Sequence, residues 1–157
     1  MAAVSLLPVI GKPAPDFTLP STSGEPVSLK QFKGKKTVVL YFYPKDETPG
    51  CTKEACGFRD LTADFDKVNA IILGVSNDPL DSHARFREKH KLPFDLLADE
   101  DATVSKAFGV YKQKNLYGKK YLGIERTTFI VDRTGRIAQI YPKVKVEGHV
   151  QEVLDFL

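Results

Sequence analysis

The sequence predicts an α/β protein in which helices flank a central mixed sheet, and three observations support this fold class. Apolar, β-branched runs without alternation occur at 37–43 and 70–76, as expected of strands buried on both faces. After each run, apolar residues recur at spacings of three and four, which indicates an amphipathic helix. A β-hairpin pattern and a helix pattern close the chain, so the strands do not all run parallel.

Length and composition predict one domain covering residues 1–157, because 157 residues with 42% hydrophobic composition can bury a single core. The 23 basic and 20 acidic residues are interleaved along the chain, which indicates a solvated surface and argues against nucleic-acid binding. The opening MAAVSLLPVI lacks a basic region and is interrupted by Pro8, so neither a signal peptide nor a membrane span is predicted. We expect a cytoplasmic protein, and an upstream plastid presequence stays open.

The first half of the chain predicts a hairpin, two strands and two helices. The runs DFTL and PVSL, separated by STSGE, predict an N-terminal hairpin, after which Ser28 is a candidate cap for a short helical turn. The strand at 37–43 ends before Pro44. A helix is predicted over 51–68, followed by the strand at 70–76 and a second helix over 79–92.

The second half predicts a short strand in FDLLAD, a short helix in ATVSKAF, a hairpin formed by RTTFIVD and RIAQIYP around DRTG, and a final helix in GHVQEVLDFL. The Lys-rich segment KQKNLYGKKY at 112–121 is expected to be a hydrated loop. This order fits a thioredoxin fold with an N-terminal β-hairpin extension best. A doubly wound flavodoxin-like sheet stays open, although the late antiparallel hairpin favours the former.

The only two cysteines, Cys51 and Cys56, lie in TPGCTKEAC, directly after the first buried strand. In a reducing compartment, neighbouring cysteines are more often metal-binding or redox-active than joined in a structural disulfide. If a helix begins at about Gly50, Cys51 lies in its first turn, where free N–H groups and the helix dipole favour a reactive thiolate.

The spacing of the cysteines constrains a disulfide between them. Residues five apart on an α-helix have Cα atoms roughly 8.6 Å apart, whereas a disulfide needs about 4.4–6.8 Å. Cys51 and Cys56 therefore cannot bond while the helix is intact. Pro49, Gly50 and Gly57 favour local unwinding of its first turns.

The residues alone leave other interpretations of the cysteines open. A zinc site needs a matching second ligand pair, and His83 and His90 are expected to be solvated on their helix face. A thioredoxin-type oxidoreductase would carry C-x2-C, in which the cysteines can meet without unwinding. Cys56 can also be a small core residue beside Ala55.

The segment PKDETPGCTKEAC at 44–56 resembles the active-site loop of peroxiredoxins, P-x-x-x-T/S-x-x-C. It is most similar to the peroxiredoxin Q, or bacterioferritin comigratory protein, branch, which carries a second cysteine five residues on and a distal arginine in a stretch like ERTTFIVD. The resemblance runs from about Ala14 to the C-terminus. It implies an atypical two-cysteine thiol peroxidase that reduces hydrogen peroxide and small alkyl hydroperoxides without a metal, haem or flavin cofactor.

The resemblance implies a role for each residue that matches the pattern. Cys51 is expected to attack the peroxide and become a sulfenic acid. Arg126 is expected to stabilise the thiolate and the negative charge that develops on the peroxide. Without the resemblance, Arg126 would be interpreted as a surface residue in an ion pair. Thr48 is expected to accept from and donate to the peroxide oxygens, and Pro44 to shield the sulfur from water.

Further roles follow from the same resemblance. The amides of Gly50 and Cys51 are expected to donate to the substrate, and Glu54 either orients Arg126 or is an exposed helix glutamate. Cys56 is expected to resolve the sulfenic acid as a Cys51–Cys56 disulfide, which an external dithiol, thioredoxin, reduces.

The three histidines, His83, His90 and His149, match nothing in the pattern, and proteins of this branch are often monomers. Two other functions stay open: a peroxide sensor or holdase that uses the same disulfide as a switch, and a thioredoxin-fold disulfide oxidoreductase that acts on protein thiols. The rate at which peroxide oxidises Cys51 separates the oxidoreductase from the other functions.

Overall fold

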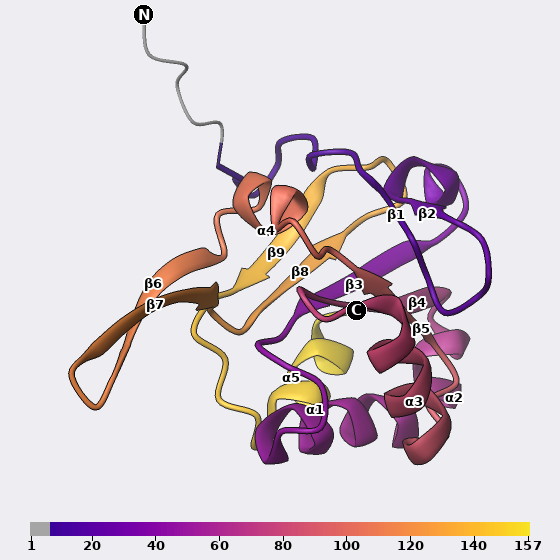
Figure 1. The fold of residues 1–157 in the computed structure, drawn as a ribbon. Helices are drawn as coiled ribbons and strands as arrows, with labels where there is room; N and C mark the ends of the chain where they lie inside the picture. Colours follow the sequence, from indigo (N-terminus) through magenta and orange to yellow (C-terminus); the bar gives the residue numbers. More distant parts are fainter. Residues whose placement is uncertain (1–6) are drawn as a thin grey trace, which may run out of the picture.

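A five-stranded mixed sheet forms the centre of the protein in the computed structural model, which describes residues 7–157 (Figure 1). The strand order is β5-β4-β3-β8-β9. The strands are β3 (Thr37–Phe42), β4 (Ala70–Ser76), β5 (Asp95–Ala98), β8 (Thr127–Val131) and β9 (Ile137–Tyr141). The first three run parallel, whereas β8 is antiparallel to both of its neighbours. The predicted α/β class with a mixed sheet is confirmed.

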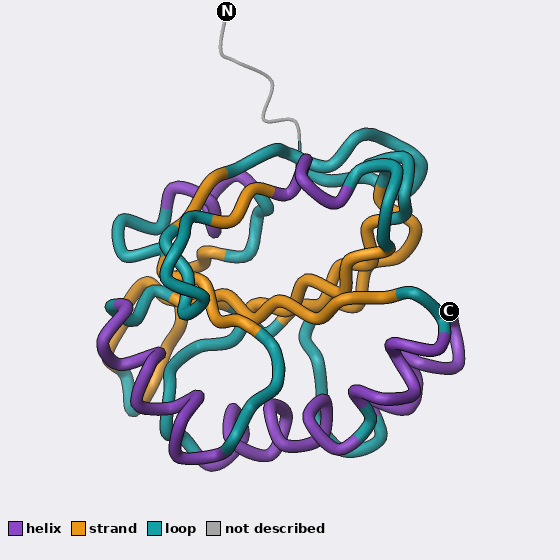
Figure 2. The backbone as a smooth tube through the Cα atoms, turned by 90° about the vertical axis from the view of Figure 1, so that its right-hand side faces the viewer, coloured by secondary structure: helices purple, strands orange, loops and turns teal. Residues whose placement is uncertain are grey.

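Both faces of the sheet are covered, as Figure 2 shows with the strands as a middle layer. One face carries the helices α1 (Pro49–Asp60), α2 (Thr62–Lys67), α3 (Leu80–His90) and α5 (His149–Phe156). The other face carries the predicted hairpin of β1 (Thr18–Leu19) and β2 (Val27–Ser28), the 3-10 turn η1 (Leu29–Phe32) and α4 (Thr103–Ala107). This arrangement is the thioredoxin-like one with an N-terminal hairpin.

Strand β3 shows why the run at 37–43 has no polar alternation. Leu40 and Phe42 pack into the cluster under the N-terminal hairpin, whereas Val39, Tyr41 and Tyr43 pack into the cluster under the helices. Successive side chains of a strand point to opposite faces, and here both faces are buried.

The single helix predicted over 51–68 is wrong, because the chain forms α1 and α2 with a break at Leu61. The backbone of Leu61 leaves helical geometry, with φ −107° and ψ 10°. The change of direction lets Phe65 of α2 pack against Phe58 of α1 with ring centroids 5.8 Å apart. Burial of both rings outweighs the continuation of one helix.

The prediction of a hydrated loop at 112–121 is also wrong, because the segment lies in a second hairpin. Strands β6 (Tyr111–Leu116) and β7 (Lys119–Ile124) pair antiparallel, with both turn residues, Tyr117 and Gly118, at positive φ. Ile124 anchors the base of the hairpin in the core, and Lys112, Lys119 and Lys120 are exposed, whereas Lys114 is half-buried. Within residues 7–157, no helix combines the length and apolar character needed to cross a membrane.

His83 is fully buried, so the prediction that it is solvated is wrong. Its Nδ1 lies 2.8 Å from Oδ2 of Asp46, and its Nε2 lies 2.9 Å from the carbonyl oxygen of Leu97. The Tyr43 hydroxyl donates to the other carboxylate oxygen of Asp46 at 2.6 Å. These bonds fasten the loop after β3 to α3 and β5.

Asp46 is held as a carboxylate by this network. Burial alone raises the pKa of a carboxyl group, but the hydrogen bond and charge of His83, with hydrogen bonds from Tyr43 and Ser82, hold the pKa of Asp46 below its ordinary value. A carboxyl group whose pKa is lowered by folding stabilises the fold above its unfolded pKa, and that contribution disappears as the pH falls through the folded pKa.

We predict that Asp46→Asn lowers the free energy of unfolding at pH 7 by about 3 kcal/mol, because it removes the buried carboxylate that accepts from Tyr43 and Ser82 and contacts His83. The deficit should shrink below pH 4, where Asp46 of the wild type takes up a proton as well. Urea unfolding at pH 7 and below pH 4 measures this deficit in stability, with Asp81→Asn on the exposed face of α3 as the matched control. A wild-type midpoint for Asp46→Asn at pH 7 would contradict the anchoring role.

Candidate active site

Sheet topology brings two distant segments together at one edge. Phe42, the last residue of β3, pairs with Thr127, the first residue of β8. The loop that follows β3 and the residue that precedes β8 therefore lie side by side. This is why Cys51 and Arg126, 75 positions apart in the chain, meet in space. The carboxyl end of parallel strands is also where α/β proteins place their ligand sites.

Helix α1 begins at Pro49, one or two residues before the predicted start. Thr48 is its N-cap residue in an extended conformation, and the carbonyl oxygen of Thr48 accepts from the N–H of Thr52 at 2.9 Å. The amides of Gly50 and Cys51 lie in the first turn, where the helix offers them no acceptor. The N-terminal end of α1 therefore presents free donors and the positive end of its dipole beside the Cys51 thiol.

Arg126 contacts Cys51 and Glu54 at once. Its Nη2 lies 3.4 Å from the Sγ of Cys51, and its Nη1 donates to Oε1 of Glu54 at 2.6 Å. The side chain of Arg126 is only 15% exposed and that of Glu54 is fully buried. Arg126 is thus no surface ion-pair residue and Glu54 no exposed helix glutamate.

Burial and the neighbouring charges act in opposite directions on the pKa of Glu54 and on that of Arg126. Burial raises the pKa of Glu54 to about 7, although the charge and hydrogen bond of Arg126 lower it. For Arg126, burial lowers the pKa, but the carboxylate of Glu54 and the sulfur of Cys51 outweigh it and the pKa is raised. The Arg126 guanidinium is therefore a permanent cation against the sulfur of Cys51.

Gly50 leaves room for the guanidinium. A Cβ atom on Gly50 would lie 3.1 Å from Nη2 of Arg126, closer than ordinary packing allows. The missing side chain lets the guanidinium lie against the first turn of α1 and reach Cys51. The sequence pattern marks Gly50 for its amide, whereas this steric requirement appears only in the structure.

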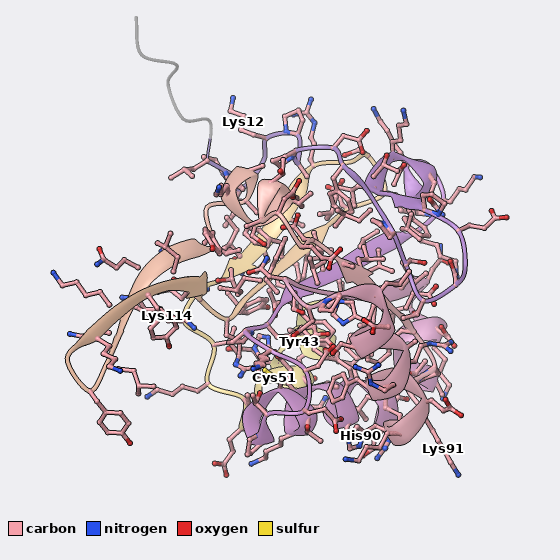
Figure 3. The ribbon with its side chains drawn as sticks, in the orientation of Figure 1. Lys12, Tyr43, Cys51, His90, Lys91 and Lys114 are labelled. Atoms are coloured by element: carbon pink, nitrogen blue, oxygen red, sulfur yellow. The ribbon has the colours of Figure 1, made fainter. Side chains whose placement is uncertain are left out.

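Thr48 and Pro44 border the same turn, both half-buried. The Thr48 hydroxyl donates to the carbonyl oxygen of Lys45 at 2.9 Å. Its single proton is thus used within the loop, and the oxygen is left free to accept. Cys51 is buried beside Tyr43 between the sheet and α1 (Figure 3).

Both cysteines are free thiols on an unbroken stretch of α1, with Cys51 buried and Cys56 half-buried. Five residues of regular helix separate their Cα atoms by about 8.6 Å. Gly57 is more than a weak point in this helix, because a Cβ there would lie 3.0 Å from Cγ2 of Val150. The close approach of α1 to α5 depends on it.

Two histidine contacts were missed by sequence reasoning. His90 is not freely solvated as predicted: its side chain is 19% exposed, and its Nδ1 lies 4.0 Å from the Sγ of Cys56. His149 is buried, with Nε2 2.8 Å from the hydroxyl of Thr128. The spacing of His90 four residues after the buried Phe86 was the available signal, since it places both on one helix face.

One cluster of metal-type ligands occurs in the described part of the chain, formed by Asp46, Asp78 and His83 rather than by the cysteines. Its polar atoms already bind one another. Oδ2 of Asp78 accepts from the N–H of Asp46 at 2.8 Å and from the hydroxyl of Ser76 at 2.6 Å. The cluster is therefore a structural network of the loop.

Comparison with known proteins agrees with this geometry. The model of the AhpC/TSA family matches residues 10–140. Peroxiredoxin Bcp of Bacillus subtilis is 51% identical over 148 residues, covering 94% of both chains, and peroxiredoxin Bcp of Escherichia coli is 44% identical over 147 residues, again covering 94% of both.

Solved structures give the same result. A Xanthomonas campestris bacterioferritin comigratory protein, described for its alkyl peroxide reduction activity, superimposes with a TM-score of 0.87 at 42% identity, covering 94% of this chain and 96% of that one. A cysteine-to-serine variant of Xylella fastidiosa peroxiredoxin Q gives a TM-score of 0.89 at 38% identity, covering 95% and 94%. With its fold, its two cysteines and these relatives, the chain belongs to the AhpC/TSA family, as a thiol peroxidase of the peroxiredoxin Q (Bcp) branch.

Proposed function

We propose that the protein reduces hydrogen peroxide and small alkyl hydroperoxides through Cys51. The observation that carries the proposal is the 3.4 Å contact between Nη2 of Arg126 and the Cys51 sulfur at the start of α1. The thiolate attacks the nearer peroxide oxygen, the O–O bond breaks, and water or an alcohol leaves. Cys51 becomes a sulfenic acid.

The groups around Cys51 stabilise the transition state in which the thiolate attacks the peroxide. The Arg126 guanidinium faces the charge that develops on the peroxide, and the amides of Gly50 and Cys51 add donors at the end of the helix. Thr48, whose proton is donated to Lys45, accepts the peroxide O–H and fixes its orientation. Pro44 limits the access of water to the sulfur, and Glu54 holds the guanidinium in place.

Cys56 resolves the sulfenic acid in this proposal. Because intact α1 keeps the two cysteines too far apart, its first turns unwind before the disulfide forms. An external dithiol such as thioredoxin then reduces the disulfide. We propose that the chain works as a single-domain monomer in the cytosol, where such reductants keep thiols free.

Substitution of each cysteine tests this division of labour. Cys51→Ser should abolish turnover, whereas Cys56→Ser should reduce one equivalent of peroxide and stall as a sulfenic acid. Stoichiometric peroxide titration with free-thiol counting and non-reducing peptide mapping measures both, with the wild type giving an intramolecular Cys51–Cys56 peptide. Sustained turnover of Cys56→Ser with thioredoxin would remove its resolving role.

Gly50→Ala should slow the oxidation of Cys51 by about tenfold, because the new Cβ pushes the Arg126 guanidinium from the sulfur. The thermal midpoint should not fall, since the backbone of Gly50 is ordinary helix and alanine favours helix. Stopped-flow oxidation checks the rate, with Lys53→Ala on the exposed face of α1 as the control. Equal rates for Gly50→Ala and the wild type would contradict the steric argument.

Glu54 gives a pH dependence of defined sign. Its folded pKa of about 7 lies above the ordinary value of 4.5, so its protonated form favours the fold and stability is lost as the pH rises between them. The wild type should therefore lose up to about 3 kcal/mol relative to Glu54→Gln between pH 5 and pH 8. Urea unfolding at both pH values measures the difference, and a constant difference would show that the carboxyl titrates normally.

A further inference from the structure

A thiol, an imidazole and a carboxylate lie in a row in space where α1, α3 and the loop before α1 meet. Nδ1 of His90 lies 4.0 Å from the Sγ of Cys56, the outer limit of an S–H to nitrogen contact. Nε2 of His90 lies 3.3 Å from Oε1 of Glu47. The chain Cys56, His90, Glu47 has the order of a nucleophile, a base and an orienting acid.

The imidazole of His90 is held in place from several sides. His90 ends α3, and its carbonyl oxygen accepts from Nη1 of Arg59 on α1 at 2.9 Å. Its ring stands edge-on to Phe86, with centroids 5.1 Å apart and planes at 73°. Only 19% of the side chain is exposed. These contacts fix the plane of the ring and keep Nδ1 directed at α1.

Glu47 adopts a backbone conformation that side chains disfavour. Its φ is +66°, in the left-handed region, directly before Thr48 of the catalytic turn. Its other oxygen accepts from Nζ of Lys89 at 2.9 Å. The Lys89 hydrogen bond keeps the pKa of Glu47 below its ordinary value, so the group is a carboxylate at neutral pH.

The contacts select one tautomer of His90. A carboxylate beside Nε2 accepts from an Nε2–H group, which leaves the lone pair of Nδ1 facing the Cys56 thiol. A histidine paired with a surface glutamate alone would have no reason to face a half-buried cysteine. A cysteine that served only the core would have apolar neighbours in place of an imidazole nitrogen.

We propose that His90 is a catalytic residue of the resolving step and that Glu47 is its positioning residue. The proposal rests on the resolving role of Cys56 described above. While α1 is intact, the Cys56 thiol proton moves to Nδ1 of His90, so Cys56 leaves the unwinding helix as a thiolate. Thiolate is the form that attacks sulfenic sulfur.

The step is balanced without a further oxidant. The Cys56 thiolate attacks the Sγ of the Cys51 sulfenic acid, the S–S bond forms, and the S–O bond breaks. The leaving hydroxide takes up a proton from solvent and departs as water. His90 gives the proton it took from Cys56 to solvent, so the protons balance and His90 is neutral again. The peroxide that made the sulfenic acid has already supplied both oxidising equivalents.

Rapid mixing of reduced protein with one equivalent of peroxide tests the proposal, with acid quenching, alkylation and mass-spectrometric counting of sulfenic acid and disulfide. His90→Gln should oxidise Cys51 at the wild-type rate but form the disulfide about 10²-fold more slowly. Glu47→Gln should slow the same step by about tenfold. Glu88→Gln, exposed on α3, is the matched control.

Two readouts separate proton transfer from mere structural support. Added imidazole should restore disulfide formation in His90→Ala, and the resolving rate of His90→Gln should rise with pH more steeply than that of the wild type. The charged groups that face His90 are Glu47, which Lys89 binds, and Arg59. Glu47, Lys89 and Arg59 are all still present in His90→Gln, so a difference in pH dependence from the wild type is due to the loss of the imidazole.

Wild-type disulfide formation in His90→Gln, or a slow step in His90→Ala that imidazole does not restore, would overturn the proposal. Failure of the proposed function gives a different result. If the wild type formed no Cys51–Cys56 disulfide, the resolving role of Cys56 itself would fail. If the wild type formed the disulfide and the His90 variants formed it equally fast, only the role of His90 would fail.

Discussion

The first two turns of α1 are the constraint on which the rest of the site depends. Because the helix begins at Pro49, the Cys51 sulfur lies beside free amides and within 3.4 Å of Arg126. The same regular helix carries Cys56 one and a half turns further on, about 8.6 Å away between Cα atoms. One element therefore has two incompatible duties: folded, it activates Cys51, and unwound, it lets the cysteines meet.

The surrounding structure separates what stays fixed from what moves. The loop before α1 is fastened to α3 and β5 by Asp46 and His83, and Arg126 is held by the buried Glu54. The Asp46–His83 anchor lies outside the turns that unwind, so the loop before α1 keeps its place between cycles. Glu54 lies within those turns, so unwinding also releases its contact with Arg126. The contact of Cys56 with His90 belongs to the moving part, because unwinding breaks it.

Most of the fold followed from the sequence because its signals are local. The apolar run at 70–76 coincides with β4, and the late hairpin pattern coincides with β8 and β9. The hairpin at 112–121 was missed because its pairing depends on tertiary anchoring by Ile124 and not on hydrophobic alternation. The break at Leu61 was missed since the periodicity of apolar residues continues across it.

Some features of the candidate site could likewise be predicted from the sequence, and others could not. The motif residues Cys51, Thr48 and Arg126 were named from the sequence, and the register of Phe42 with Thr127 accounts for their meeting. The steric demand at Gly50 and the burial of His83 were out of reach, because both arise from side chains that pack across elements far apart in the chain. A histidine on a predicted helix face gives no local sign of whether that face meets solvent or another helix.

Amide hydrogen exchange of α1 in the reduced and the peroxide-oxidised protein tests the central claim most directly. The account predicts that the amides of residues 52–57 are protected in the dithiol form and lose protection once the disulfide has formed, while those of β3 and β4 stay protected. An oxidised protein that holds an intramolecular Cys51–Cys56 disulfide and still protects these amides as strongly as the reduced form would contradict it.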